Sequence, residues 1–442
     1  TPFALALPLL FVTLPAILFY SLLFRDAVNI PFWDDYDALL EFLNHMTLLD
    51  GLSAKISYFL AAQHNEYKLF LLHGVAWLQY VFFGHIDFRV LSILGDTFVL
   101  LLAILLWTMF LPNRKDLAGR LVLFIPVSWL LFQFQYWETL NWSMAGLQNL
   151  PILVFSLAAI NLLVKGTRAA FWGAVVLFIL SVAASGNGFV LIPVGLLILV
   201  LSRSYLRVAI WILAAAVCIA AYAYHYNIWS AQTGPHRSVI ANFHPFAPAY
   251  VLAFIGSAGC VPIRAGSFVV GTILCLFFIF MICRGYIRRN PLVSYCVLFL
   301  LLTAIGVAGI RSEFGVSQAV SSRYTIYSAL FLIFSWFAIV EEFLQNKPAS
   351  LLKNDALLIA VGISVLFSLG IDGLGMIQLK SHARGLAEGM SAYLHPSSSG
   401  TEAGPSPRIL ILNPDPLTAP FNRHARPILA ESIRLGVYRP PQ

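Results

Sequence analysis

The chain has 442 residues, of which 60% are hydrophobic and only 11% are charged. Soluble domains carry about 25% charged residues, and the mean hydropathy here is +0.83, so most of this chain must lie in lipid. The apolar runs lack the alternation of apolar and polar residues that a membrane β-barrel requires. The net charge of +7 does not indicate nucleic-acid binding, because Lys and Arg collect in the cytoplasmic loops of membrane proteins. The composition therefore predicts an all-α polytopic membrane protein.

A membrane-spanning helix needs about 20 consecutive, predominantly apolar residues. Eleven runs come close to that length, and the first is too long for the core of a signal peptide. The predicted spans are Phe3–Phe24, Phe88–Leu111, Leu121–Tyr136, Leu150–Val164, Ala170–Ala183, Phe189–Leu201, Val208–Tyr226, Ser267–Cys283, Leu292–Ile310, Ile326–Val340 and Ala356–Leu369.

The connections between these spans are of two kinds. One set is short and basic, and the positive-inside rule places it in the cytoplasm; its members are Asn113–Arg120, Lys165–Arg168, Arg203–Arg207, Cys283–Asn290 and Asn346–Lys353. The other set must then face outward, beginning with the long first loop of residues 26–87, and the histidines collect in it and in the tail. We therefore expect any chemistry on the outer face.

Two further apolar stretches, Lys68–Phe83 and Phe246–Gly259, would reverse the side of every later loop if they crossed the membrane. We expect both to lie flat at the outer interface, with a buried half-span as the alternative for either. Residues 1–370 then form the transmembrane domain. Residues 371–442 form a small region outside the membrane, in which Arg408–Pro414 is predicted to be a short buried strand.

The first outer loop carries two polar motifs, "FWDDYD" and "QHNEYK". They bring the following side chains into one loop: Asp34, Asp35, Asp37, His64, Glu66 and Lys68. Carboxylates are costly beside lipid, and a desolvated carboxylate can have a raised pKa and act as a general base. The alternative is an ordinary solvated loop in which Trp33 anchors the chain at the interface.

Two arginines, Arg311 and Arg323, lie in the outward stretch "RSEFGVSQAVSSRYTIYS", against the positive-inside bias. Ser321 or Ser322 could cap the following helix, and a helix N-terminus beside a guanidinium makes an anion site. The stretch therefore predicts a clamp for a phosphate, and Arg237 and Arg264 are further candidates. Arginines that reach to lipid headgroups are the alternative.

A third outward stretch, "QYWETLNWSMAGLQN", supplies Glu138, Asn141 and Gln148 among tryptophans. Aromatic faces flanked by hydrogen-bonding groups suit a sugar ring, and they equally suit the aromatic belt of a membrane interface. The shorter stretch "SGNG" that follows is read as a tight turn.

Metal ligation is a separate question for the first loop. Asp35, His64 and Glu66 are acceptable ligands for a metal, but no spacing in the chain resembles a structural zinc site. We therefore assign no metal site and no cofactor, and a divalent metal ion remains an open alternative.

The order of these motifs resembles the GT-C superfamily of membrane glycosyltransferases, in the branch that decorates bacterial envelope glycans. The resemblance covers Phe3 to Phe343 in layout and is carried by "WDDYD", "QHNEYK", "QYWETLNW" and "SSRYTIYS". It implies a bundle of about 11 transmembrane helices with interfacial helices in the first outer loop. It also implies a polyprenyl-phosphate sugar donor, a glycan or glycolipid acceptor, and a place in the bacterial inner membrane with the active site facing the periplasm.

The sequence therefore predicts an inverting glycosyltransferase. Arg323 and Arg311 would hold the donor phosphate, while one aspartate of the Asp34–Asp35 pair removes the proton of the acceptor hydroxyl. Adjacent residues point apart, so only one of the pair can be the base, and we favour Asp35. A transporter or flippase of a polyprenyl-linked glycan is the alternative, but it should show polar features on both faces or two related halves, and no internal repeat is found.

Overall fold

The computed structural model describes residues 2–111, 116–227, 247–259, 264–344, 355–395 and 418–441. Within these ranges the chain is almost entirely helical, and its only extended pairings are two isolated β-bridges. Nine helices of this part are long and apolar enough to cross a membrane. The predicted all-α polytopic class is confirmed, whereas the strand predicted at Arg408–Pro414 falls outside the described residues.

All the predicted spans fall on helices, which the structure bounds as α1 Pro2–Asp26, α5 Phe88–Met109, α6 Leu117–Leu131, α8 Ser143–Lys165, α9 Arg168–Ala184, α10 Leu191–Leu201, α11 Tyr205–Ala223, α13 Arg264–Cys283, α15 Pro291–Arg311, α16 Thr325–Ile339 and α17 Asp355–Leu394. Two of them, α9 and α10, are not among the nine candidate spans, whereas α6 and α16 reach spanning length together with the turns beside them, over Leu117–Leu140 and Ser322–Glu342. With 17 residues, α9 is about 26 Å long, somewhat less than the hydrocarbon core of about 30 Å.

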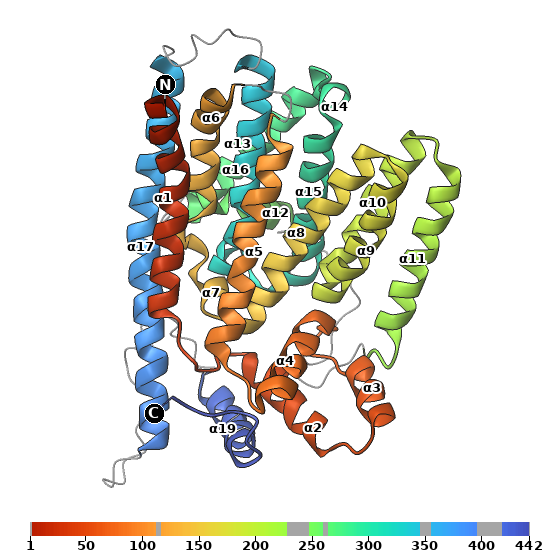
Figure 1. The fold of residues 1–442 in the computed structure, drawn as a ribbon, viewed down its shortest axis with the longest axis vertical. Helices are drawn as coiled ribbons and strands as arrows, with labels where there is room; N and C mark the ends of the chain where they lie inside the picture. The colour runs from red at the N-terminus through yellow and green to blue at the C-terminus, as the bar shows by residue number, and fades with distance from the viewer. Residues whose placement is uncertain are drawn as a thin grey trace.

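Successive long helices run in opposite directions, so the basic connections that the structure describes in full, Lys165–Arg168, Arg203–Arg207 and Cys283–Asn290, lie at one end of the bundle, the upper end in Figure 1. These connections are tight because capping residues stop and restart the helices. Gly166 ends α8 with a φ of 67°, and the side chain of Thr167 accepts the N–H of Ala170 at 3.2 Å to begin α9. Asn290 caps α15 in the same way, with Pro291 in its first turn.

The first loop forms a compact module at the opposite end, beneath the bundle in Figure 1. It contains the π-helix η1 (Tyr36–Glu41), α2 (Phe42–Leu48), α3 (Leu52–Ala61) and α4 (Phe70–Phe83). Its apolar side chains form a core of their own, separate from that of the bundle. With 14 residues, α4 is about 21 Å long and does not cross the bundle, as we predicted for Lys68–Phe83.

Short turns complete the bundle. They are η2 Phe134–Tyr136, α7 Trp137–Leu140, η3 Gly186–Val190, η4 Ser257–Gly259, α14 Tyr286–Arg289, η5 Ser312–Phe314, η6 Val316–Val320, η7 Ser322–Tyr324 and the π-helix η8 Val340–Leu344. Three of these turns, α7, η3 and η7, carry Glu138, Asn187 and Arg323, which are described below.

The helix α12 (Ala247–Gly256) is buried inside the bundle and packs along α13. The two helices approach closely at two glycines. A Cβ on Gly256 would meet the carbonyl oxygen of Ser267 at 1.9 Å, and one on Gly271 would meet that of Leu252 at 1.9 Å. Of the two alternatives for Phe246–Gly259, the structure therefore favours the buried half-span.

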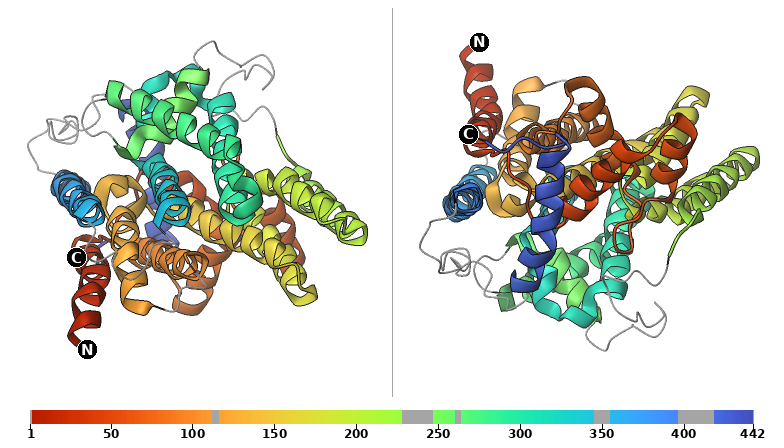
Figure 2. Two further views of the ribbon diagram at one scale, coloured as in Figure 1. Left: turned by 90° about the horizontal axis from the view of Figure 1, so that it is seen from above. Right: turned by 90° about the horizontal axis from the view of Figure 1, so that it is seen from below.

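The C-terminal region begins inside α17, which passes through residue 370 without a break. Its 40 residues span about 60 Å, twice the hydrocarbon thickness, so α17 extends beyond the bundle beside the first-loop module (Figure 1). The last helix, α19 (Thr418–Arg434), packs on η1 and lies across this end of the molecule in Figure 2. The carbonyl oxygen of Val437 then accepts the N–H of Ile86 at 2.8 Å.

Candidate functional site

A polar cavity lies where the first-loop module meets the bundle. The space that protein atoms leave free there is about 560 Å³, a volume that includes open solvent at the mouth of the cavity. The first loop, α8, η3 and the segment that follows α15 all contribute to its wall, through Asp34, Asn65, Tyr67, Trp142, Met144, Ala145, Gln148, Asn149, Asn187, Val307, Arg311, Arg323 and Tyr324. Of the predicted site residues, Asp34, Gln148, Arg311 and Arg323 are therefore gathered around one space.

The two neighbouring aspartates have different surroundings. Asp35 is 1% exposed, and its two carboxylate oxygens accept the N–H of Phe32 at 3.1 Å and that of Met144 at 2.9 Å. Burial raises the pKa of Asp35 to about 7, although these hydrogen bonds oppose the rise. Asp35 thereby fastens the first loop to the start of α8, while Asp34 faces the cavity.

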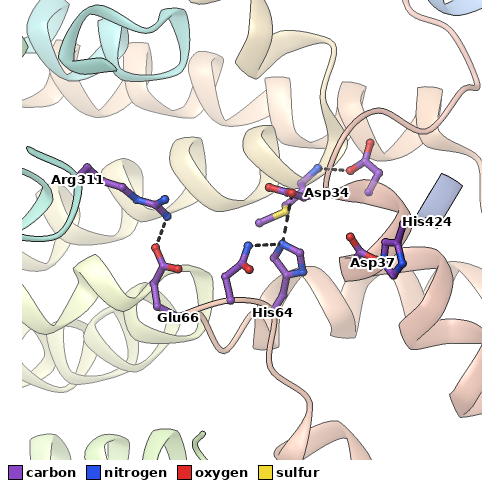
Figure 3. Close-up of polar contacts among 9 residues, drawn as sticks. Asp34, Asp37, His64, Glu66, Arg311 and His424 are labelled. Carbon is purple, nitrogen blue, oxygen red and sulfur yellow. Dashed lines mark hydrogen bonds and ion pairs between the residues drawn. The ribbon is translucent and has the colours of Figure 1, made fainter. Parts of the chain in front are cut away.

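Asp34 is paired with a buried histidine from the second polar motif of the loop. The Nε2 atom of His64 lies 3.6 Å from Oδ1 of Asp34 and 2.9 Å from the side-chain nitrogen of Asn65 (Figure 3). Burial by itself would lower the pKa of His64, but the hydrogen bond and charge of Asp34, with the charges of Asp37 and Glu66, raise it. The carboxylate of Asp34, on the cavity wall, is thus paired with an imidazole that is not itself part of the lining.

Arg311 forms an ion pair with Glu66 on another side of the cavity (Figure 3). The main chain of Glu66 is itself held, because its carbonyl oxygen accepts the hydroxyl groups of Tyr222 at 3.2 Å and Tyr226 at 3.1 Å. Glu66 therefore neutralises part of the positive charge of Arg311 and joins the first loop to the end of α15.

Arg323 has a different environment. Its guanidinium lies 5.7 Å from the ring centroid of Trp142 and 5.3 Å from that of Tyr324, and no carboxylate within the described ranges is close enough to form an ion pair with it. Three donors on cavity-lining residues have no hydrogen-bond partner in this part of the chain: Nε of Arg311, Nε of Arg323 and Nε1 of Trp142.

The serines before Arg323 do not cap a helix, so that prediction is wrong. Ser321 donates its hydroxyl to the carboxylate of Glu138 at 3.1 Å, and Ser322 donates to the carbonyl oxygen of Gln135 at 3.0 Å. Neither α16 nor the turn before it has a side-chain cap. Glu138 thus supports the turn that carries Arg323 and does not line the cavity.

Four other candidates lie elsewhere or cannot be placed. The Nζ atom of Lys68 donates to the carbonyl oxygens of Leu60 and Ala61, both at 2.8 Å, and of Tyr224 at 2.7 Å, and burial lowers its pKa. Lys68 therefore joins α3 to the end of α11. Asn141 is buried outside the cavity lining. The side chain of Arg264 and the whole of Arg237 fall outside the described residues.

Several cavity residues were not singled out in the sequence. Asn65, Tyr67 and Tyr324 directly neighbour chosen residues, so a wider window around each motif would have included them. Asn187 comes from the "SGNG" break, which we read only as a turn. The break is a turn, η3, but it also delivers a polar side chain to the cavity.

The suggested metal ligands Asp35, His64 and Glu66 do not converge, because each is engaged with a different partner. The cavity is lined by the carboxylate of Asp34, which lies beside the imidazole of His64, whose pKa is raised. It is also lined by the guanidinium groups of Arg311 and Arg323, each of which has a donor without a partner in the described part of the chain. Such a set can accept a proton at one point and hold an anion at another.

Comparison with known proteins adds no further constraint. No family model matches the sequence, and neither a curated protein nor a solved structure is recognisably similar to it. The functional argument therefore rests on the geometry of this cavity.

Proposed function

We propose that this chain is an inverting glycosyltransferase of the GT-C type that moves a sugar from a polyprenyl-phosphate donor to a glycan or glycolipid acceptor. The observation that carries the proposal is that Asp34, which is paired with His64, lines the same cavity as two arginines that have unpartnered donors. Buried donors without partners are costly, and phosphate and sugar oxygens would satisfy them.

In the proposed reaction, Asp34 accepts the proton of the acceptor hydroxyl. That oxygen forms a bond to the anomeric carbon of the sugar from the side opposite the phosphate, so the configuration inverts. The bond between the anomeric carbon and the phosphate oxygen breaks, and its electron pair leaves with the polyprenyl phosphate. Arg323, aided by Arg311, stabilises the negative charge that gathers on the leaving phosphate.

The roles of the two aspartates differ from our first preference. Asp35 uses both of its carboxylate oxygens on backbone N–H groups and is almost fully buried, so a substrate hydroxyl would have to displace one of them. Asp34 lines the cavity, and within the described residues its carboxylate accepts no backbone N–H group. We therefore assign the base to Asp34, and we assign to Asp35 the positioning of the loop that carries it.

A lipid-linked donor agrees with the surface of the bundle. The outer helices α1, α11, α13 and α17 expose most of their apolar side chains, as helices that face lipid do. The basic connections lie at the end away from the cavity, so the positive-inside rule would place the cavity on the periplasmic face of a bacterial inner membrane. A cysteine placed at Asp50 should then react with an impermeant thiol reagent in spheroplasts; protection until lysis would reverse the orientation.

The test uses the purified protein in liposomes, a radiolabelled polyprenyl-phosphate sugar and a panel of glycan and glycolipid acceptors. An enzyme releases polyprenyl phosphate and gives a labelled acceptor, in equal amounts. A transporter or flippase would instead move the intact donor to the other leaflet without breaking the sugar–phosphate bond, and protein-free liposomes report the background of both processes. Donor movement without any transfer would overturn the proposal.

A further inference from the structure

We propose that Asp37, Glu41 and His424 bind a divalent transition-metal ion that fastens the C-terminal helix α19 to the first-loop module. Within the described ranges, this is the one group of three or more His, Cys, Asp or Glu side chains that could hold an ion, and their ligand atoms all lie within 4.8 Å of one another. The group lies outside the cavity, so the inference does not depend on the proposed function.

The backbone brings these ligands together from two distant parts of the chain. Asp37 and Glu41 both lie on the π-helix η1, whose wide turn places residues four apart on nearly the same face. α19 packs against η1, and the amide of Asn44 donates to the carbonyl oxygen of Ile428 at 3.4 Å. His424, on the same helix as Ile428, is thereby held beside the carboxylate of Asp37 (Figure 3) and within reach of Glu41.

Two carboxylates and one imidazole meet at this point. Nε2 of His424 lies 2.6 Å from Oδ1 of Asp37, and within the described part of the chain no Lys or Arg forms an ion pair with Asp37 or Glu41. A divalent cation would neutralise both, and small side-chain rotations would lengthen the His–Asp contact to accommodate ligand bonds of about 2.0–2.2 Å.

The donor set also indicates which ions would bind. One imidazole and two carboxylates suit zinc, cobalt or manganese, whereas calcium and magnesium prefer oxygen ligands throughout. Three protein ligands leave positions for water. The side chain of Asp37 is 9% exposed and that of His424 is 52% exposed, so one side of the group is closed by protein and the other is open for the ion to enter.

The experiment measures Co²⁺ and Zn²⁺ binding to the full-length protein, freed of any affinity tag and stripped with a chelator. We expect one equivalent of Co²⁺ to give a visible absorption band, one equivalent of Zn²⁺ to displace it, and both ions to raise the melting temperature. Mg²⁺ at the same concentration should neither displace Co²⁺ nor raise the melting temperature.

Two variants separate a metal site from a simple hydrogen bond. Glu41→Gln keeps the His424–Asp37 contact but removes one metal ligand. His424→Ala removes both that contact and a metal ligand. Each variant should weaken metal binding at least tenfold. His45→Ala, a histidine of the same module that bonds to Tyr58, should bind as the wild type does. If the wild-type protein shows no saturable binding at one equivalent, or if Glu41→Gln binds as tightly as the wild type, the contact is only a hydrogen bond and the proposal fails.

Discussion

The two ends of the helix bundle are built on different principles. At the upper end, the chain reversals are local: a glycine, a capping side chain or a proline turns the chain within a few residues, as between Gly166 and Thr167. Side-chain contacts there, such as Tyr286 to Glu341 and Arg289 to Glu342, join residues 55 and 53 positions apart. At the lower end, polar side chains bind partners that are 109, 245 and 387 residues away, in Asp35 to Met144, Arg311 to Glu66 and His424 to Asp37. Buried polar groups held by such remote partners are costly to arrange, which is why we place the function at this end.

The sharpest way to test this contrast is to remove the least compensated charge at the lower end. Arg323→Ala should reduce transfer by on the order of 2–4 kcal/mol of transition-state stabilisation, as loss of an oxyanion donor does, or about 30- to 1000-fold. Arg323→Lys keeps the positive charge but loses the planar guanidinium that can donate two parallel hydrogen bonds. Its transfer activity should lie between those of the wild type and Arg323→Ala. Turnover of the donor, measured for all three proteins, checks this order; a loss of only a few-fold in Arg323→Ala would make Arg323 a lipid anchor.

The second prediction concerns stability. Asp35→Asn keeps the shape of the side chain, but it replaces one acceptor with an N–H group and leaves a buried backbone N–H unpaired. The free energy of unfolding should fall by about 1–3 kcal/mol, measured by denaturant titration in a mild detergent. Asp50→Asn, at an exposed loop position, is the matched control and should unfold as the wild type does. Equal stability of the two variants would contradict the fastening role of Asp35.

Much of the fold could be predicted, because apolar length, capping residues and loop charge are local signals. Apolar length placed a predicted span on each of the nine long helices of the described residues, although it ended α17 at Leu369 and not at Leu394. Loop charge was the reason that Lys68–Phe83 was predicted not to cross the membrane. The division of labour between Asp34 and Asp35 could not be predicted, since it depends on the N–H of Met144, which only the folded chain brings near. The packing of α19 on η1 and the position of Lys68 away from the cavity could not be predicted either, because both depend on contacts between residues that are distant in the sequence.

A smaller effect is expected from pH. The raised pKa of His64 means that the folded protein keeps a proton that the unfolded chain releases near pH 6.5. The resulting stabilisation is fully present below that pH and is lost as pH rises through the folded-state pKa. We expect it to be about 1 kcal/mol or less, the net value of one such bond. Melting temperatures from pH 5.5 to 8.5 should show this decline in the wild type and a weaker one in His64→Gln; parallel curves would show that His64 stays neutral.

The smallest effect should come from the other end of the bundle. Arg288 lies in α14 within an exposed basic connection, and exposed charges contribute little to stability. Arg288→Gln should leave the melting temperature unchanged and donor turnover within about threefold of the wild type, which corresponds to less than about 1 kcal/mol of activation free energy. A loss as large as that in Arg323→Ala would remove the functional contrast between the two ends.

The most direct test of the account is the transfer activity of Asp34→Asn, measured beside donor-induced thermal stabilisation of the same protein. The amide keeps the shape of the side chain but cannot accept the proton of the acceptor, whereas the arginines that would bind the donor are untouched. The account predicts that transfer falls to background while the donor still raises the melting temperature, and that Asp50→Asn retains both properties. Transfer by Asp34→Asn at a rate near that of the wild type would contradict the central claim.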